Sequence, residues 1–457
     1  MTRVYKLIGK PHVLCATALK CTNTPLNIPT REIFEEYERK PENAKQVIKE
    51  FLQGSPQDKE RFENPLEVEE FIRKYLEHGH AETKELIRRI WGFKHKMSAE
   101  FDNSMYVFEP VSRFLTLYMW NPMNIHGQVI GRGLEASLRL LSPVDYERVD
   151  GIDKLWDSAV AANETAKSEG IPVEDRRFVR PLCARTRVAL AVTPRYAAKI
   201  YNNLSKVKNK EFEEVGTDLG KIIEEDIGFI PDDRPAYSWS SHYPTDAVLK
   251  GSEYEEPLEP MKIEHYYCSE DMSCEYLVAT IRGSLAMYGQ MVRNAQVETR
   301  IEPWTNILKR SEFVVPRTFE NKPVALACYK KLQEELSKAQ LEAGSAQRLF
   351  ELPYFFSMGQ EAVGRIVASS HDAIKEVITH RACQKAMWEI RDNIFVPLSE
   401  ELNKRHGKRI YGPDCKIIHD CSESKRFVEG RDFKYPIILD RETGKEIPCP
   451  LYEEECF

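Results

Sequence analysis

The sequence predicts an α+β fold that is built twice along the chain. Short apolar segments of strand length alternate with longer stretches whose apolar residues recur at helical spacing, which favours a mixture of strands and helices. These segments follow one another in the same order in two halves, a pattern that indicates a duplication. Between the halves, residues 228–260 are rich in Pro, Ser, Asp and Tyr and show little periodicity, as is typical of a linker.

Proline and glycine bound the elements expected in the first half. Pro41 interrupts a charged helical stretch, Pro65 suits a first helical turn, and Gly170 stops a helix. In chain order we expect a strand at residues 4–8, helices at 31–51 and 64–75, a strand at 105–108, a buried helix at 111–120, a helix at 146–169 and a helical block at 195–223.

The second half repeats this plan. Pro323 stands at the first turn of a long helix, and Pro397 ends or kinks another. In chain order we expect a strand at 276–281, helices at 285–292 and 323–343, a turn with a short apolar run at 346–353 and a helix at 371–396. The expected domains are a first half at 1–227, a linker at 228–262, a second half at 263–411 and a cysteine-containing tail at 412–457.

Composition bounds the class of protein. A chain of 457 residues, 42% apolar and 30% charged, suffices for two or three globular domains. The net charge of -7 gives no basic field, so nucleic acid is not an expected partner. No apolar run approaches the ~18 residues that span a membrane, and we expect neither membrane insertion nor a signal peptide. Its 11 scattered cysteines fit a reducing compartment, so the expected location is cytoplasmic.

The most informative phrase is Glu135-Ala-Ser137-Leu-Arg139-Leu140. A carboxylate, a hydroxyl and a guanidinium stand at alternate positions, and in an extended segment this period of two aims them to one side. Such side chains form a polar pocket wall: the arginine would fork onto a phosphate or a carboxylate, the serine would donate to the same oxygens, and the glutamate would hold a sugar hydroxyl or an imide N–H. The face of an amphipathic helix is the alternative interpretation of the same residues, and the hexapeptide taken alone favours that alternative.

Other phrases of the first half carry similar side chains. His95-Lys-Met-Ser98-Ala-Glu100 precedes the apolar segment at 105–108, and the pair Ser112-Arg113 follows that segment. Residues 170–182 read Gly-Ile-Pro-Val-Glu-Asp-Arg-Arg-Phe-Val-Arg-Pro-Leu, with Arg177 shortly before the Pro-Leu pair.

The second half contains three further phrases. Gln290-Met-Val-Arg293-Asn294-Ala follows an apolar helix, and Arg348 lies shortly before a Leu-Pro pair. Residues 381–391 read Arg-Ala-Cys-Gln-Lys-Ala-Met-Trp-Glu-Ile-Arg.

Together these phrases resemble the motifs of the flavin-dependent thymidylate synthases, over most of residues 90–225 and 265–415. The resemblance is most specific at 381–391, which is similar to the closing Arg-x4-Ala-Gln-x-Glu-Ile-Arg helix of that family. It implies a duplicated α+β fold of mixed sheets packed with long helices. It also implies reductive methylation of C5 of the uracil in dUMP, with FAD carrying the hydride and methylene-tetrahydrofolate supplying the carbon.

The resemblance also assigns roles to residues. Each site of this family combines side chains of several subunits; here the first half keeps the wall from Glu135 to Arg139, and the second half keeps the opening Gln and Arg. We therefore expect one asymmetric pyrimidine-nucleotide site per chain between the halves, and a homo-oligomer that is a dimer of pseudo-dimers. The implied residues are Glu135, Ser137 and Arg381 for catalysis, Arg139, Arg177, Gln290, Arg293 and Arg348 for substrate binding, and His95, Arg113 and Asn294 for cofactor binding.

Two alternatives stay open because the chain departs from the family at its Arg-His-Arg triplet, which contacts flavin and nucleotide. The triplet is replaced by Asn-Pro-Met at 121–123 and by Arg-Asn-Ala at 293–295. The chain is then either a related enzyme that modifies C5 of a pyrimidine nucleotide, for example by hydroxymethyl transfer, or a degenerate, non-catalytic nucleotide-binding or assembly protein.

The cysteines of the tail are candidate metal ligands. The soft side chains there are Cys415, His419, Cys421, Cys449 and Cys456. Zinc sites usually show tighter pairs such as Cys-x2-Cys, so these spacings favour free thiols. Cys268 and Cys274 are interpreted in the same way, and no metal site is predicted.

Overall fold

A computed structural model divides the chain into two compact units. Unit 1 comprises Met1–Met123, Ile130–Asp145 and Arg185–Ser240, and unit 2 comprises Asn124–Val129, Tyr146–Ala184 and Ser241–Phe457. The residues that the structure describes are 4–7, 31–32, 35, 39, 104–120, 124–125, 128–129, 131–135, 146–147, 149–205, 207–227, 230, 259–272, 274–291, 297–302, 304–345, 351–383, 386–417, 437–439 and 446–449.

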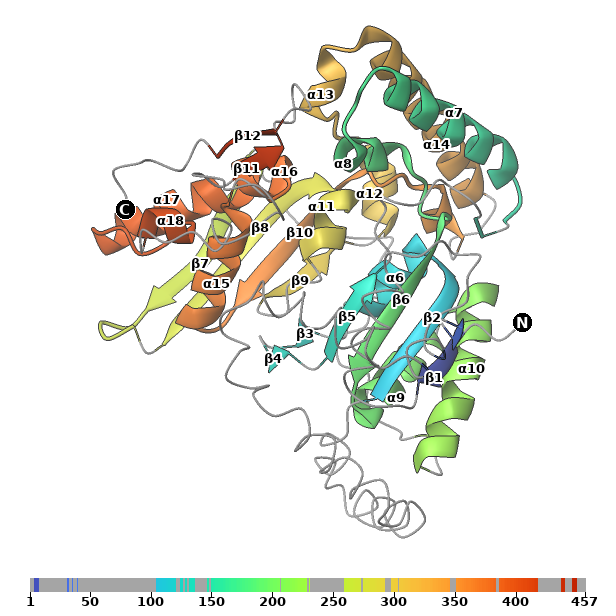
Figure 1. The fold of residues 1–457 in the computed structure, drawn as a ribbon, viewed down its shortest axis with the longest axis horizontal. Coiled ribbons are helices and arrows are strands. Elements are labelled where there is room, and N and C mark those ends of the chain that lie inside the picture. Colours follow the sequence, from blue (N-terminus) through green and yellow to red (C-terminus); the bar gives the residue numbers. More distant parts are fainter. Residues whose placement is uncertain are drawn as a thin grey trace. The chain divides into compact units, whose positions relative to one another are not determined.

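Unit 1 is built on a 4-stranded antiparallel sheet with the strand order β1-β2-β6-β5 (Figure 1). The strands are β1 (Val4–Leu7), β2 (Ser104–Ser112), β5 (Gly131–Glu135) and β6 (Arg185–Val192), and the helices are α6 (Arg113–Trp120), α9 (Pro194–Leu204) and α10 (Lys210–Ile227). The ring of Phe212 in α10 lies 4.9 Å from that of Phe114 and 5.0 Å from that of Tyr118, both in α6. These buried aromatic contacts join the two helices in the core of the unit.

Unit 2 contains a second 4-stranded antiparallel sheet with the order β7-β8-β10-β9 (Figure 1). Its strands are β7 (Met261–Cys268), β8 (Glu275–Ser284), β9 (Glu298–Ile301) and β10 (Glu361–Ala368). In each sheet the first strand pairs with the second, the second with the fourth, and the fourth with the third. The two sheets therefore share one topology.

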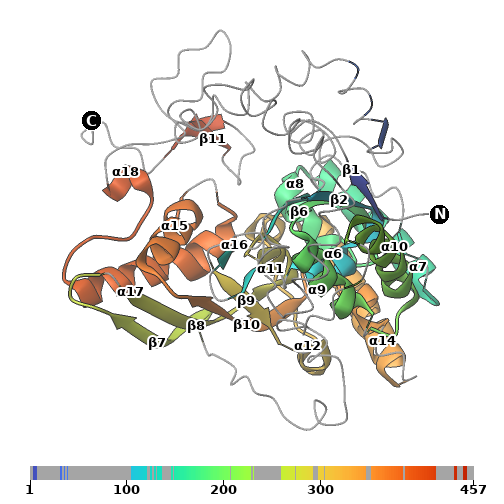
Figure 2. The same ribbon diagram turned by 90° about the horizontal axis from the view of Figure 1, so that it is seen from below.

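A segment from the first half of the sequence, Tyr146–Ala184, packs within unit 2. Its helix α7 (Ile152–Ser168) lies beside α14 (Pro323–Ser345) in both views (Figures 1 and 2). Two backbone hydrogen bonds also connect the end of this segment to residues 356–358: Leu182 N donates to Phe356 O at 2.7 Å, and Met358 N donates to Arg180 O at 2.7 Å. Elements from both predicted halves thus build unit 2, while the predicted domain boundaries stay a prediction.

Unit 2 contains further helices and two small sheets. The helices are α8 (Val173–Arg176), a 3-10 turn (Arg177–Val179), α11 (Leu285–Met291), α12 (Trp304–Arg310), α13 (Arg317–Glu320), a second 3-10 turn (Leu352–Phe355), α15 (His371–Arg381), α16 (Trp388–Ile390), a π-helical turn (Arg391–Phe395), α17 (Val396–His406) and α18 (Asp414–Ile417). Two small 2-stranded sheets pair β3 (Asn124–Ile125) with β4 (Gln128–Val129) and β11 (Ile437–Leu439) with β12 (Glu446–Pro448).

The predicted α+β class is confirmed, but one long helix is not. The expected continuous helix at 371–396 is wrong, because α15 ends at Arg381 and a new helical segment begins at Trp388. Pro397 does not end a helix: the helical run passes from the π-helical turn at Arg391–Phe395 directly into α17, and Pro397 is the second residue of α17. The expected block at 195–223 also divides, into α9 and α10.

Strand β2 runs on to Ser112, so the helix expected from 111 begins instead at Arg113. The helix expected at 64–75 lies outside the described residues. None of the helices that the structure describes combines the length and the apolar character needed to cross a membrane.

Candidate functional site

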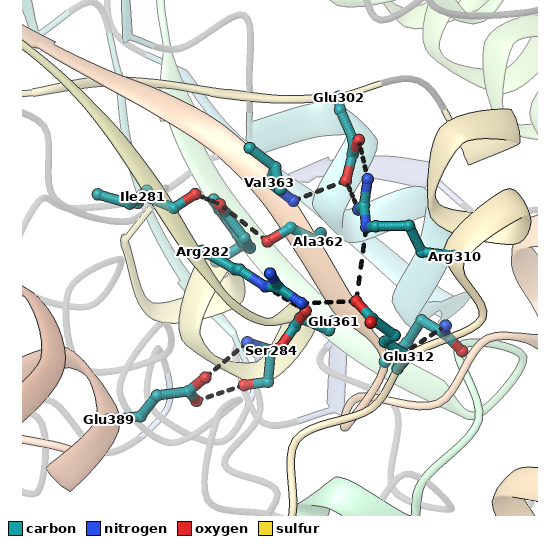
Figure 3. A network of polar contacts seen from close by, with 12 residues as sticks. Ile281, Arg282, Ser284, Glu302, Arg310, Glu312, Glu361, Ala362, Val363 and Glu389 are labelled. Atoms are coloured by element: carbon teal, nitrogen blue, oxygen red, sulfur yellow. Dashed lines mark hydrogen bonds and ion pairs between the residues drawn. The ribbon is translucent and has the colours of Figure 1, made fainter. Parts of the chain in front are cut away.

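A buried glutamate and a buried serine lie at the centre of unit 2. Strand β8 ends at Ser284, whose backbone N–H donates to Glu389 Oε1 at 2.6 Å and whose hydroxyl donates to Glu389 Oε2 at 2.5 Å (Figure 3). The same hydroxyl accepts a bond from Met287 N at 3.1 Å and so caps the start of α11. Both side chains are fully buried. This Ser–Glu clamp joins the sheet to α16.

The environment of Glu389 shifts its proton equilibrium. Burial raises the pKa of Glu389 to about 7, against the opposing effect of the two bonds from Ser284 and of the positive charge of Arg177. Glu361, which pairs directly with Ser284 in the β8–β10 register, adds a further upward contribution to the pKa of Glu389. A carboxyl group with such a pKa exchanges its proton near neutral pH, a property common at functional sites.

Two predicted site residues of the second half are in direct contact. Arg381 closes α15 and Gln290 lies in α11; Arg381 Nη2 donates to the backbone oxygen of Gln290 at 3.1 Å. Both side chains are partly exposed. The contact orients the guanidinium against the end of α11, where it offers a positive charge with directional N–H donors.

The phrase at 170–182 packs against the closing motif at 381–391 inside unit 2. Asp175, which is buried, accepts a bond from Thr318 Oγ1 at 2.8 Å and one from Trp388 Nε1 at 3.3 Å. The guanidinium of Arg317 lies 5.3 Å from the centre of the Trp388 ring. Trp388 is buried.

Unit 1 contains a second Ser–Glu clamp with the same pattern. Ser112 ends β2, its N–H donates to Glu211 Oε1 at 2.6 Å, and its hydroxyl donates to Glu211 Oε2 at 2.7 Å. The Ser112 hydroxyl also accepts from Leu115 N at 3.0 Å, which caps α6 as Ser284 caps α11. Each clamp thus joins the second strand of a sheet to a helix that comes later in the same unit.

A branched network of charged side chains borders the clamp of unit 2 (Figure 3). Arg282 donates to Glu361 Oε1 at 2.5 Å and to Glu312 Oε2 at 2.6 Å. Arg310 donates to Glu302 Oε2 at 2.8 Å, and Glu302 Oε1 accepts from the backbone of strand β10 at 2.6 Å. The network fastens the segment after β9 to β8 and β10, which is a structural role.

Several predicted site residues fall outside the described part of the chain. Glu135 is described only as the last backbone position of β5. The predicted residues that lie wholly outside the described ranges are His95, Ser137, Arg139, Arg293, Asn294 and Arg348. Their roles stay predictions, as does the metal content of the tail, where the described ranges hold only Cys449 and the backbone of Cys415.

The residues assigned to the flavin fit it poorly where they are described. Arg113 is 4% exposed and begins α6 directly after the clamp serine of unit 1. A guanidinium with so little exposure offers little surface to a bound ring. The described part of the chain therefore supplies no flavin contact through Arg113, and no chemical step is assigned to that residue.

Sequence reasoning missed the two clamps. Glu389 stands inside the closing motif and Ser112 in the pair Ser112-Arg113, but nothing in the neighbouring sequence marks either as a partner of a residue 105 or 99 positions away. The available signal was the repeat itself: each clamp serine lies at the junction of an apolar strand and an apolar helix.

Comparisons with known proteins give a limited result. No protein-family model matches the sequence, and no curated protein matches it. Among solved structures, the chain is similar to a crystal structure of thymidylate synthase X (ThyX) from Helicobacter pylori with FAD and dUMP. The TM-score is 0.26 and the identity 16%, and the match covers 35% of this chain and 89% of that chain.

Proposed function

We propose that the chain is a pyrimidine-nucleotide-binding protein of the flavin-dependent thymidylate synthase type, and that it methylates C5 of the uracil in dUMP. The observation that carries the proposal is the closing motif at 381–391, whose first arginine contacts Gln290 in the structure. Both residues belong to separate motifs of the resemblance, and a shared contact is what a common site requires.

A duplicated origin supports the same proposal. The two sheets have the same strand order. In each unit a serine ends the second strand, and its hydroxyl donates to the carboxylate of a buried glutamate. Two sheets of independent origin would not be expected to share both the strand order and the Ser–Glu clamp. In a duplicated chain each half can lose the part of a composite site that the other half supplies, which accounts for the divided motifs.

Arg381 is the residue to which we assign the central role. Its guanidinium would face a carbonyl of the pyrimidine and stabilise negative charge as the C5 carbon becomes nucleophilic. Ser137 and Arg139 would hold the phosphate, with Gln290, Arg293 and Arg348 at the phosphate or ribose, Arg177 at the substrate and Glu135 beside the base. Bound flavin would supply the hydride and methylene-tetrahydrofolate the carbon.

Binding of dUMP to the purified full-length chain tests the proposal. Arg381→Ala removes one charge-assisted contact, so the Kd should rise by about 10- to 150-fold, and Arg139→Ala should act similarly. Arg31→Ala is the matched control, because this exposed arginine forms an ion pair with Glu35 one helical turn away. If only one of the two site arginines matters, the idea of a site shared by both motifs fails.

Flavin content and product formation decide between the enzyme and its alternatives. A chain that carries flavin and converts dUMP with methylene-tetrahydrofolate should yield dTMP, whereas a hydroxymethylated product would indicate the related enzyme. The degenerate, non-catalytic nucleotide-binding protein is favoured by the coverage of Arg113 and by the replaced triplets. Binding of dUMP with no flavin affinity would establish that second candidate and end the methyltransferase proposal.

A further inference from the structure

A cluster of metal-binding side chains lies where the β7–β8 hairpin meets the end of α17, within unit 2. Cys268 ends β7 and pairs in register with Glu275, which begins β8. His406 is the last residue of α17, the helix that lies beside this hairpin in both views (Figures 1 and 2). One ligand atom from each of these three residues lies within 4.8 Å of the other two.

The spacing suits a single small cation. Tetrahedral zinc has bonds of about 2.0–2.3 Å, which places its ligand atoms about 3.3–3.8 Å from one another. His406 Nε2 already lies 3.9 Å from Glu275 Oε1. Small side-chain rotations would therefore bring the sulfur, the oxygen and the nitrogen onto one ion.

The carboxylate of Glu275 is held in place by neighbouring groups. Its side chain is fully buried, and His371 Nδ1 lies 2.7 Å from Oε2. The hydroxyls of Tyr266 and Tyr411 each donate to Oε1 at 2.5 Å. Hydrogen bonds from outside the ligand set orient metal-binding carboxylates and histidines in the same way.

The chemistry of the donors selects the metal. A thiolate, an imidazole and a carboxylate together are typical ligands of zinc, whereas magnesium and calcium take oxygen donors. With three protein ligands, the fourth position falls to a water molecule or to the hydroxyl of Tyr266, which is within hydrogen-bond reach of both His406 and Glu275.

We propose that Cys268, Glu275 and His406 bind one zinc ion, which fastens the end of α17 to the β7–β8 hairpin. The site is separate from the residues assigned to the nucleotide and does not depend on that assignment. It revises the interpretation of Cys268 as a free thiol, which rested on sequence spacing that could not include His406.

Metal analysis of the full-length, untagged chain tests this proposal. Mass spectrometry should find one zinc per chain. After a chelator has removed the zinc, the protein should bind one equivalent of cobalt and show the d–d absorption bands of a tetrahedral site. A thiolate-to-cobalt charge-transfer band should accompany them. Cys268→Ser should abolish that band and weaken zinc binding at least tenfold.

Cys274→Ser is the matched control, since Cys274 is an exposed cysteine in the same hairpin. This variant should keep the stoichiometry and the charge-transfer band. His406→Ala tests a second ligand. This variant should retain no zinc, and addition of zinc should no longer raise its Tm.

Two results would overturn the proposal. One is a wild-type chain that retains no zinc and binds cobalt no more tightly than the Cys268→Ser variant, which would leave a hydrogen-bonded cluster without an ion. The other is a zinc signal that persists in Cys268→Ser but disappears in Cys421→Ser, which would assign the metal to the cysteines of the tail.

Discussion

Glu389 accepts a hydrogen bond at each of its two carboxylate oxygens from one residue, Ser284, whose N–H and hydroxyl donate at 2.6 and 2.5 Å. The bidentate arrangement fixes the carboxyl plane against the junction of β8 and α11. Because Glu211 and Ser112 repeat it in unit 1, the clamp is a feature of the fold rather than of one site. What distinguishes Glu389 is its setting beside Arg177 and Glu361.

The first prediction concerns pH. The folded-state pKa of Glu389, about 7, lies above the ordinary value of 4.5, so ionisation favours the unfolded chain. The stability linked to its proton is fully present below about 4.5 and is lost as the pH rises through about 7. Glu389→Gln cannot ionise, so its free energy of unfolding relative to the wild type should increase by on the order of 2 kcal/mol between pH 5 and pH 8.

Urea unfolding at the two pH values measures this difference. Glu401→Gln, at a half-exposed glutamate of α17, is the control and should follow the wild type at both. Parallel pH profiles for Glu389→Gln and the wild type would show that Glu389 is ionised in the folded chain throughout this range.

The second prediction compares the two clamps. Ser112→Ala and Ser284→Ala each remove a hydroxyl that donates to a buried carboxylate and also caps a helix. Each should lower the free energy of unfolding by about 1–3 kcal/mol, because a buried acceptor loses a donor. Ser205→Ala serves as the control, since that exposed hydroxyl bonds only to Asn202 O. A loss for one serine and none for the other would mean that the clamps are not equivalent.

The sequence could predict the α+β class and the apolar strands but not all of the sheet. Strand β9 holds an ion pair of its own, between Arg300 and Glu298 at 2.5 Å, and Arg365 of β10 pairs with Glu264 of another strand, β7, at 3.1 Å. When the charges of a strand are paired with those of another strand, its sequence does not show the regular alternation of apolar and polar residues. Local periodicity is blind to such partners.

The site shows the same limit. The contact of Arg381 with Gln290 could be anticipated only from the order of motifs, since 91 positions separate the two residues. The pKa of Glu389 could not be anticipated at all, because it depends on burial, on the hydrogen bonds from Ser284 and on the charges of Arg177 and Glu361. Sequence spacing reports which residue types are available, and folding decides which of them meet.

The third prediction concerns the charged network. Arg310 forms an ion pair with Glu302, whose side chain is 1% exposed. Arg310→Ala removes this pair from a buried carboxylate and should cost about 3–5 kcal/mol. Arg31→Ala breaks its exposed pair with Glu35 and should cost less than about 1 kcal/mol. Thermal or urea unfolding of both variants provides the measurement, and equal small losses would show that Glu302 is solvated or neutral.

The fourth prediction concerns the hydrogen bonds between the segment at 170–182 and the closing motif at 381–391. Asp175→Ala removes the carboxylate that accepts hydrogen bonds from the indole N–H of Trp388 and from the hydroxyl of Thr318. The free energy of unfolding should therefore fall by about 1–3 kcal/mol. Asp175→Asn keeps one acceptor and should lose less, while Asp157→Ala, at an exposed position of α7, should be neutral. Urea unfolding ranks the three variants. If Asn is as costly as Ala, the charge of Asp175 rather than its hydrogen bonding holds the two motifs together.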